Sequence, residues 1–360
     1  MTQRKPFPLN SWYAAAWCHE IRHELAARTI CDKDVVLYRR STGEVAALED
    51  ACWHRLLPLS LGRLEGDQVV CGYHGLVFNA EGRCTYMPAQ KTINPSACVR
   101  SYPVVEKHRL VWLWPGDPAL ADPATIPDFH WNDGAEWVGE GGTFYDLRCD
   151  YRLVVDNLMD LTHETYVHAG SIGDEAITSA PFEVTHTDRT ATVTRWMIDI
   201  DPPPFWKKQL DRPGAHADRW QIIYFQAPSV VVGDVGVAVT GTGAPQGDRS
   251  QGVNGAFLAA ITPATETSCH YFWNFVRTFR TDDDQLTRDI QRAHVNDGKG
   301  VYDQDHAVLE AQQKAIARNP RLPFYNLNID AGALWARRLI DGLLDRESSP
   351  AGPARSQAAE

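Results

Sequence analysis

The sequence predicts an α+β fold, in which an N-terminal all-β domain precedes a larger domain with an antiparallel sheet flanked by helices. Three observations predict it. The first part of the chain contains short β-rich segments without a helical period, the remainder mixes β-rich and helical segments, and a proline-rich stretch separates the two. We therefore expect domains at residues 1–117 and 118–346, followed by a disordered tail at residues 347–360.

The predicted strands of the first domain are short and end in a proline-rich boundary. Residues 34–39 and 44–48 flank a Thr-Gly pair and predict a hairpin. Residues 111–114, Val-Trp-Leu-Trp, predict a further apolar strand. Prolines then crowd into residues 115–127, where neither a strand ladder nor a helix can continue.

The second domain is expected to contain strands first and helices later. The pattern turns helical from Asp282 to Arg318, and Gly298 and Gly300 are expected to divide this stretch in two. Asp330 can cap a last helix. β-rich composition predicts strands at residues 190–198, 220–225, 230–232 and 269–275.

Composition and charge exclude several classes of protein. The chain has 360 residues, of which 44% are hydrophobic and 22% charged, as in ordinary globular proteins. Its net charge of -11 argues against a nucleic-acid or anionic-membrane partner. The N-terminus has no apolar signal-peptide core, and no run approaches the roughly 18 apolar residues of a membrane helix. We therefore expect a soluble, cytoplasmic protein.

A first metal-binding pattern consists of two arms, Cys52-Trp-His54 and Cys71-Gly-Tyr-His74. Each arm offers one thiolate and one imidazole, whereas a zinc finger groups its cysteines in one arm and its histidines in the other. This alternation suits a binuclear centre in which two thiolates hold one iron and two imidazoles hold the other. The pattern therefore predicts a Rieske [2Fe–2S] cluster, with a zinc site as the alternative.

A second pattern lies in residues 157–168, where His163 and His168 are five positions apart. On a straight helix this spacing rotates the second side chain by about 140° from the first, so the two imidazoles meet one ion only if the helix ends or bulges between them. Two imidazoles and one carboxylate form the facial triad that binds non-haem Fe(II) and leaves positions open for oxygen. The carboxylate could be local, from Asp156, Asp160 or Glu164, or it could come from the helical segment at residues 301–310.

The two patterns together indicate a reaction. A redox cluster can feed single electrons to an iron that binds O2, whereas a hydrolase has no use for such a cluster. We therefore expect reductive O2 activation directed at a C–H bond or an arene.

At these residues the chain resembles the Rieske non-haem iron oxygenases, and within them most closely the oxygenase components of vanillate O-demethylase (vanillate monooxygenase). The resemblance extends from about Pro8 to Arg346. It is carried by Val70-Cys-Gly-Tyr-His-Gly-Leu-Val77, Trp114-Pro-Gly-Asp117, Cys149-Asp-Tyr-Arg-Leu153, Asp156-Asn-Leu-Met-Asp-Leu-Thr-His-Glu-Thr-Tyr-Val-His168, Pro203-Pro-Phe-Trp206, Asp218-Arg-Trp-Gln221, Tyr271-Phe-Trp273 and Leu327-Asn-Ile-Asp-Ala-Gly332.

The resemblance implies a role for each candidate ligand. It implies that Asp305 completes the iron site, because the following Leu-Glu pair and glutamines match the family helix; Gln304 replaces the usual Glu, and Asp303 is the weaker alternative. The first Rieske arm departs from the family, which has Pro where this chain has Trp53. The resemblance assigns the cluster to Cys52, His54, Cys71 and His74, and the mononuclear iron to His163, His168 and Asp305.

Two further residues are implied to act beside the iron. The resemblance gives Asp160 the role of bridging the electron path between cluster and iron, through His74 of the partner subunit, and places Asn157 beside the metal. Asp160 precedes His163 by three residues, so we expect its carboxylate to accept the proton of that imidazole's free nitrogen.

The expected function is that of the oxygenase component of an aromatic O-demethylase. The resemblance implies hydroxylation of the methoxy methyl group of vanillate or a related methoxybenzoate, giving the phenol (protocatechuate from vanillate) and formaldehyde. It also implies a homotrimer and electrons from NADH through a separate flavin and iron–sulfur reductase; no Gly-x-Gly-x-x-Gly follows a predicted strand. The alternatives are a dicamba-like or toluenesulfonate-like oxygenase, a Rieske electron carrier without catalysis, and a zinc-dependent hydrolase or zinc-stabilised binding protein.

Candidate substrate contacts come from a predicted strand and from the charge of the expected substrate. His270 alternates with Tyr271 and Trp273 on a predicted strand, and we name it as a candidate substrate contact. A substrate carboxylate would call for an arginine as its bidentate partner, and Arg195 is one of several candidates.

Overall fold

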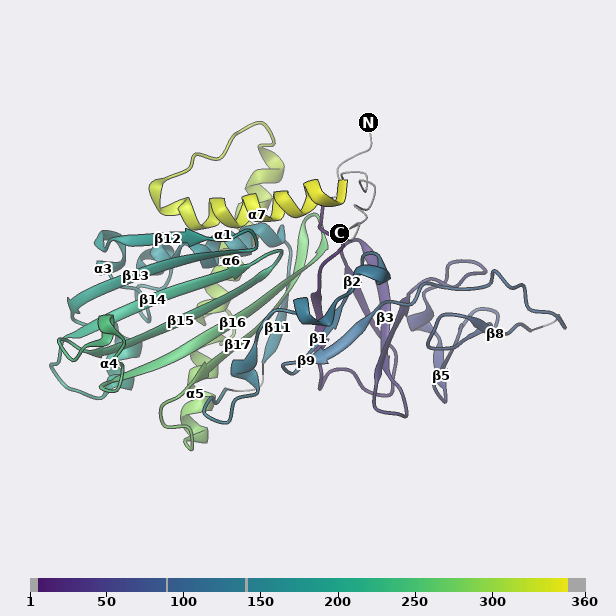
Figure 1. Ribbon diagram of the computed structural model, residues 1–360, viewed down its shortest axis with the longest axis horizontal. Coiled ribbons are helices and arrows are strands. Elements are labelled where there is room, and N and C mark those ends of the chain that lie inside the picture. The colour runs from purple at the N-terminus through teal and green to yellow at the C-terminus, as the bar shows by residue number, and fades with distance from the viewer. Residues whose placement is uncertain (1–5, 89, 140–141, 349–360) are drawn as a thin grey trace, which may run out of the picture.

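The structure is a computed structural model that describes residues 6–88, 90–139 and 142–348. Figure 1 shows a β-rich N-terminal part at one end of the molecule and a large sheet covered by helices at the other. This arrangement confirms the predicted α+β class and the order of its two parts. Most of the expected tail lies outside the described residues, but residues 347 and 348 belong to the last helix rather than to the tail.

The N-terminal part is built from three small antiparallel sheets, with strand orders β1-β10-β9, β2-β3-β4 and β5-β6-β7-β8. The predicted hairpin is present, with Val36 opposite Leu48, and Gly43 has the positive φ of 93° that its turn requires. The elements are β1 (Tyr13–Trp17), β2 (Ala26–Ile30), β3 (Lys33–Arg39), β4 (Val45–Glu49), η1 (Leu59–Leu61), β5 (Arg63–Glu65), β6 (Gln68–Val70), β7 (Val77–Phe78), β8 (Cys84–Tyr86), β9 (Val104–Lys107) and β10 (Leu110–Leu113).

The predicted boundary is a pair of short 3-10 turns, η2 (Pro118–Leu120) and η3 (Pro123–Thr125). Asp117 and Asp122 cap them through side-chain oxygens that accept hydrogen bonds from backbone N–H groups. Another turn, η4 (His130–Asn132), follows them. The prolines thus end the first group of strands, and the exact residue of the domain boundary stays a prediction.

The second part is organised around one antiparallel sheet in the order β11-β17-β16-β15-β14-β13-β12. The four predicted strands are present, whereas β16 was missed because glycines and Pro263 within it resemble strand breakers. The strands are β11 (Thr143–Leu147), β12 (Phe182–His186), β13 (Thr190–Ile200), β14 (Ala217–Gln226), β15 (Val230–Val239), β16 (Gly252–Thr265) and β17 (Ser268–Arg277).

Helices surround this sheet, and the stretch predicted to divide at its glycines does so, into α5 and α6. In Figure 1, α7 lies along the sheet beside α1, β12 and β13. Within the described ranges, none of the helices is both long and apolar enough to span a bilayer. The helical elements are α1 (Tyr151–Met159), η5 (Leu161–His163), α2 (Glu164–Val167), α3 (Ala176–Ser179), α4 (Pro204–Leu210), η6 (Ala244–Gln246), α5 (Asp284–His294), α6 (Val301–Arg318), η7 (Asn328–Asp330) and α7 (Ala331–Ser348).

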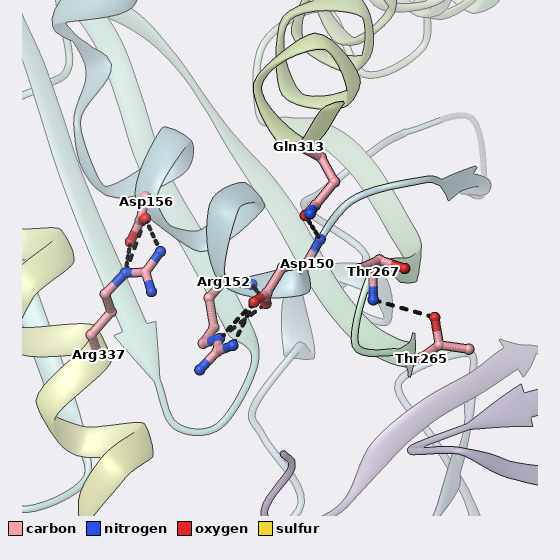
Figure 2. A network of polar contacts seen from close by, with 7 residues as sticks. All are labelled: Asp150, Arg152, Asp156, Thr265, Thr267, Gln313 and Arg337. Atoms are coloured by element: carbon pink, nitrogen blue, oxygen red, sulfur yellow. Dashed lines mark hydrogen bonds and ion pairs between the residues drawn. The ribbon is translucent and has the colours of Figure 1, made fainter. Parts of the chain in front are cut away.

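Polar contacts fix α1 between α6 and α7, as Figure 2 shows. Arg337 of α7 donates from Nε to both carboxylate oxygens of Asp156, at 2.9 and 3.0 Å. Gln313 of α6 accepts a 2.8 Å hydrogen bond from the backbone N–H of Asp150, which caps α1. Because these contacts hold α1 at both its start and its middle, the residues at its end are held in place for the site described below.

The two parts of the chain are also joined directly. Thr262 Oγ1 donates a buried 2.6 Å hydrogen bond to the Ala14 carbonyl, and the Cys31 N–H donates to the Pro263 carbonyl at 2.8 Å. Glu347, near the end of α7, accepts hydrogen bonds from the backbone N–H groups of Leu9 and Asn10. The N-terminal part is therefore packed onto β16 and tied to the last helix.

Candidate active site

The predicted irregularity between the two histidines is the end of α2, because His168 follows its last residue with non-helical backbone (φ -115°, ψ 24°). α1 stops at Asp160, where the backbone is extended (φ -128°, ψ 98°), and the chain continues through η5 and α2. This path brings the imidazole rings of His163 and His168 to 5.3 Å between centroids, which a straight helix could not do.

The carboxylate beside these rings comes from α6. Asp305 Oδ1 lies 3.4 Å from His163 Nε2 and 3.2 Å from His168 Nε2. The ligand atoms of the three residues all lie within 4.8 Å of one another, so one ion can contact all of them. The arrangement is that of a two-histidine, one-carboxylate site.

Both imidazoles present Nε2 to this site because Nδ1 is occupied. His163 Nδ1 lies 2.7 Å from the Asp160 carbonyl oxygen, and His168 Nδ1 lies 2.7 Å from Gln304 Oε1. Both oxygens are acceptors, so the neutral form of either imidazole would carry its proton on Nδ1 and leave Nε2 free to bind a metal ion. His168 Nε2 is buried and has no hydrogen-bond partner among the described residues, as expected of an atom that binds a metal ion. The residues therefore fit a mononuclear iron.

The other carboxylates considered for this site have different partners. Asp303 accepts hydrogen bonds from three backbone N–H groups before α6, those of Asn296, Gly298 and Gly300, and from the Tyr145 hydroxyl. It holds the start of the helix in place. Asp156 is ion-paired with Arg337, and Glu164 with Arg219. None of these three carboxylates belongs to the cluster formed with His163 and His168 in the described structure.

Asp160 contacts His163 differently from our expectation. Its carboxylate accepts hydrogen bonds from the N–H and the hydroxyl of Thr162, at 3.0 and 2.7 Å, and thereby caps η5. The expected carboxylate–imidazole contact is wrong within this chain, because the backbone carbonyl of Asp160 occupies His163 Nδ1 instead. Asn157 lies where expected, and its Nδ2 donates to Asp305 Oδ1 at 3.3 Å.

The two Rieske arms form loops with the same backbone pattern. The Cys52 N–H donates to the carbonyl five residues later, and the Cys52 carbonyl accepts from the N–H four residues later; Cys71 does the same. The residues in the fourth position, Leu56 and Gly75, both have positive φ, at 59° and 73°. One loop follows β4 and the other joins β6 to β7. Two similar turns therefore present a cysteine and a histidine each.

The side chains of these loops fit a cluster with two buried and two exposed ligands. Cys52 and Cys71 are buried, whereas His54 and His74 are exposed, with ring centroids 4.6 Å apart. Burial raises the pKa of the Cys52 thiol to about 11, and the adjacent Cys71 thiol adds to the increase. A metal ion bound beside the Cys52 thiol would favour its thiolate form, which is the form that ligates iron.

A cavity opens on the iron-site histidines and has an apolar wall. About 600 Å³ of non-atom space, part of it open solvent, lies between its lining residues. The wall is formed by Leu158, Leu161, Ile172, Phe205, Trp206, Val235, Phe257, Phe275 and Val301, and the polar members are His163, Glu164, His168, Arg219, Gln221, His294, Tyr302 and Asp305.

The structure places the two substrate-contact candidates away from this cavity. His270 has both ring nitrogens occupied, by Asp146 Oδ1 at 2.5 Å and by the Thr29 carbonyl at 2.9 Å, and it lies where β17 meets the N-terminal part. Arg195 lies on β13 with its guanidinium 5.2 Å above the Phe182 ring. Neither lines the cavity, so neither is placed to contact a substrate bound there.

Sequence reasoning missed four polar residues that do line the cavity, Arg219, Gln221, His294 and Tyr302. Arg219 and Gln221 are buried and two positions apart on β14, so they point to the same face of the sheet. A charged and a polar residue two positions apart in a β-rich segment was the available signal. Burial lowers the pKa of His294 to about 4, so this imidazole is neutral at pH 7.

Two family models match the chain in line with this geometry. Residues 11–103 match the Rieske [2Fe-2S] domain, and residues 147–346 match the vanillate O-demethylase oxygenase C-terminal domain. The chain belongs to the vanillate O-demethylase oxygenase family. Family membership confirms the predicted fold class, and it establishes a Rieske cluster and a mononuclear iron as the cofactors of this oxygenase.

Individual relatives of this oxygenase match over nearly their whole length. The vanillate O-demethylase oxygenase subunit of Pseudomonas sp. (strain HR199 / DSM 7063) is 42% identical, covering 97% of this chain and 98% of the relative. The toluene-4-sulfonate monooxygenase system iron-sulfur subunit of Comamonas testosteroni is 41% identical, covering 96% and 100%. Among solved structures, dicamba monooxygenase bound to 3,6-dichlorosalicylic acid has a TM-score of 0.88 at 34% identity, covering 96% of this chain and 99% of the other.

Proposed function

We propose that this protein is an oxygenase component that O-demethylates vanillate or a related methoxybenzoate, giving the phenol and formaldehyde. The observation that carries the proposal is the apolar cavity that opens directly on His163, His168 and Asp305. The 42% identity to a vanillate O-demethylase oxygenase subunit supports vanillate as the first substrate to test.

The reaction balances with one external source of electrons. A methyl aryl ether, O2, two electrons and two protons give a hydroxymethyl aryl ether and water. The hemiacetal then loses its hydroxyl proton, the bond between its aryl oxygen and the former methyl carbon breaks to release formaldehyde, and the phenolate takes up a proton to give the phenol. When bound, the cluster delivers electrons singly and the ferrous iron activates O2. Relatives are named as subunits or components of larger systems, which supports a separate reductase, fed by NADH, as the electron donor here.

The residues of this chain position the reactants. Gln304 and the Asp160 carbonyl hold the two imidazoles in one tautomer and orientation, and Asn157 holds Asp305 through its amide. The apolar wall excludes water and holds an aromatic ring in front of the three ligand side chains.

A panel of substrates with a compatible reductase tests the proposal. We expect vanillate to yield formaldehyde and protocatechuate in equal amounts, measured by formaldehyde trapping and chromatography. Dicamba and toluene-4-sulfonate serve as comparison substrates, since relatives bear those names. Oxygen consumption without any demethylated product across all methoxybenzoates would contradict the proposal, and so would an electron-carrier activity without turnover.

We propose that the protein forms an oligomer in which one subunit completes the site of the next. In Figure 1 the loops around β5 and β8 lie at the far end of the molecule from α1 and α6. An exposed His74 can contact another subunit. We propose a homotrimer in which His74 of the partner subunit faces Asp160, and in which Asp160 links cluster and iron.

Replacing Asp160 by asparagine tests this link. Asparagine keeps an oxygen that can accept from the Thr162 N–H, so the cap of η5 and both metal centres should persist. It removes the negative charge, and we expect product formation in a single turnover of the pre-reduced protein to fall at least about 100-fold. Rapid-quench measurement of product, with iron content and the Rieske EPR signal determined on the same sample, checks this.

Asp156→Asn is the matched control, because it makes the same change on α1 at a residue paired with Arg337 instead. This control should lose some thermal stability and retain its single-turnover rate. If fully metallated Asp160→Asn protein turned over at the wild-type rate, Asp160 would have no part in electron transfer.

A further inference from the structure

The polar end of the cavity is built around Arg219. Its Nη2 donates to Glu164 Oε2 at 2.8 Å, and Gln221 Nε2 donates to the same oxygen at 3.0 Å. All three side chains are buried and line the cavity. Glu164 therefore fixes the guanidinium through one edge only.

The other edge of this guanidinium has no partner. Arg219 Nη1 is buried and makes no hydrogen bond with any described residue, although the side chain is only 2% exposed. Buried polar groups are otherwise almost always paired, so an unpaired donor on a charged group indicates a missing acceptor. Among the described residues that line the cavity, Arg219 is the one that carries a permanent positive charge.

We propose that Arg219 Nη1 binds the acid group of an arene carboxylate or sulfonate, with the ring lying along the apolar wall between Arg219 and the iron ligands. The proposal rests on the proposed function and names the residue that selects its substrates. Two relatives of about equal identity are named for vanillate and for toluene-4-sulfonate, which share an aromatic ring with an acid group. The N–H groups along one edge of a guanidinium can donate hydrogen bonds to either a carboxylate or a sulfonate.

The neighbouring polar groups complete the site without competing for the anion. Gln221 Oε1 is also buried without a partner, and as an acceptor it takes a hydroxyl or water donor. The apolar wall lies next to the polar end of the cavity, because strand pairing places Val235 opposite Gln221. Phe257 and Phe275, which pair with each other on the following strands, belong to the same wall. The cavity thus has one end for an anion and one apolar wall for the ring.

The test compares ligands that differ only in charge. Toluene-4-sulfonate and its neutral sulfonamide, and vanillate and its amide, are titrated calorimetrically into the iron-loaded oxygenase. We expect wild-type protein to bind each acid about 10- to 100-fold more tightly than its amide, the size of a hydrogen bond to a charged group. In Arg219→Lys we expect this ratio to fall below about threefold, because an ammonium paired with Glu164 has no second planar edge.

Two further variants separate anchoring from folding. Arg195→Lys makes the same change on the neighbouring strand outside the cavity and should keep the full preference for acids. Glu164→Gln/Arg219→Gln removes both charges of the buried pair together, so it leaves no unpaired charge, and it should lose the preference as well. Iron content and Rieske EPR signal confirm that each variant is intact.

The outcomes distinguish this proposal from the proposed function. If wild-type protein binds acids and amides equally, or if both Arg219 variants keep the preference, Arg219 is not the anchor, whatever the enzyme demethylates. If the acid preference disappears with Arg219 while wild-type protein releases no formaldehyde from any methoxybenzoate, the anchor stands and the O-demethylase function fails.

Discussion

Asp305→Ala protein is expected to lose its mononuclear iron and all measurable turnover while it keeps the Rieske cluster. The carboxylate lies 3.2 and 3.4 Å from the two imidazoles that complete the site, and a pair of histidines alone holds Fe(II) poorly. Loss of a residue that only supports a ligand typically lowers metal affinity 10- to 100-fold, so loss of the ligand itself should exceed about 100-fold. Iron per protein, the Rieske EPR signal and formaldehyde release measure the three effects separately.

Asp303→Ala is the matched control for this prediction. It removes the same side chain two residues earlier, where the carboxylate accepts from Asn296, Gly298 and Gly300 at the start of α6. We expect a lower melting temperature and nearly normal iron content. The opposite pattern, in which Asp303→Ala loses iron and Asp305→Ala keeps it, would show that the other carboxylate is the ligand.

Cys71→Ser and His74→Ala proteins are expected to be colourless in the visible region and to lack the reduced Rieske EPR signal. Each substitution removes one of four ligands from the two similar loops, and the cluster has no substitute donor of the same geometry there. Without the cluster, electrons do not reach the iron, so turnover with the reductase should fall below detection. Mononuclear iron should remain, because His163 ends η5, His168 directly follows α2 and Asp305 lies on α6, all in the other part of the chain.

Cys98→Ser serves as the control for these variants, since Cys98 is exposed and lies outside both loops. It should keep the red-brown colour and the EPR signal. Retention of both properties by Cys71→Ser would overturn the Rieske ligand assignment for this residue.

Much of the fold could be predicted because it follows from local composition. The hairpin at Gly43 depends on turn chemistry between two β-rich segments, and the division of the last helical stretch at Gly298 depends on a residue that breaks helices. β16 escaped prediction because Gly252, Gly255 and Pro263 suppress the local β signal. Its residues form a strand because strands on both sides supply the hydrogen bonds.

The candidate site was predictable where spacing carries the chemistry. Alternating Cys and His residues indicated the cluster, and the helix end between His163 and His168 was the expected way to bring two imidazoles together. Spacing could not choose between Arg195 and Arg219 for a substrate acid, because both occur in β-rich segments. Their environments are set by strand pairing and by Glu164, which the sequence does not reveal.

The same limit explains why the contact of the Asp160 carboxylate with His163 was predicted wrongly. Sequence spacing placed its carboxylate near the His163 ring, but the helix ends at this residue, and its carbonyl takes the position that the carboxylate would need. The carboxylate turns instead to the hydroxyl and N–H of Thr162. A helix end therefore exchanges main-chain and side-chain roles in a way that periodicity cannot show.

The position of Asp305 along the chain couples iron binding to folding. His168 comes before strands β12 to β17, and Asp305 comes after all of them, so the three ligands meet only when the whole sheet has formed. The cluster ligands, by contrast, are all contributed between β4 and β7. Because an ion that binds only the native state stabilises it, we expect iron bound at this site to stabilise the complete catalytic half, and the cluster to stabilise the loops between β4 and β7.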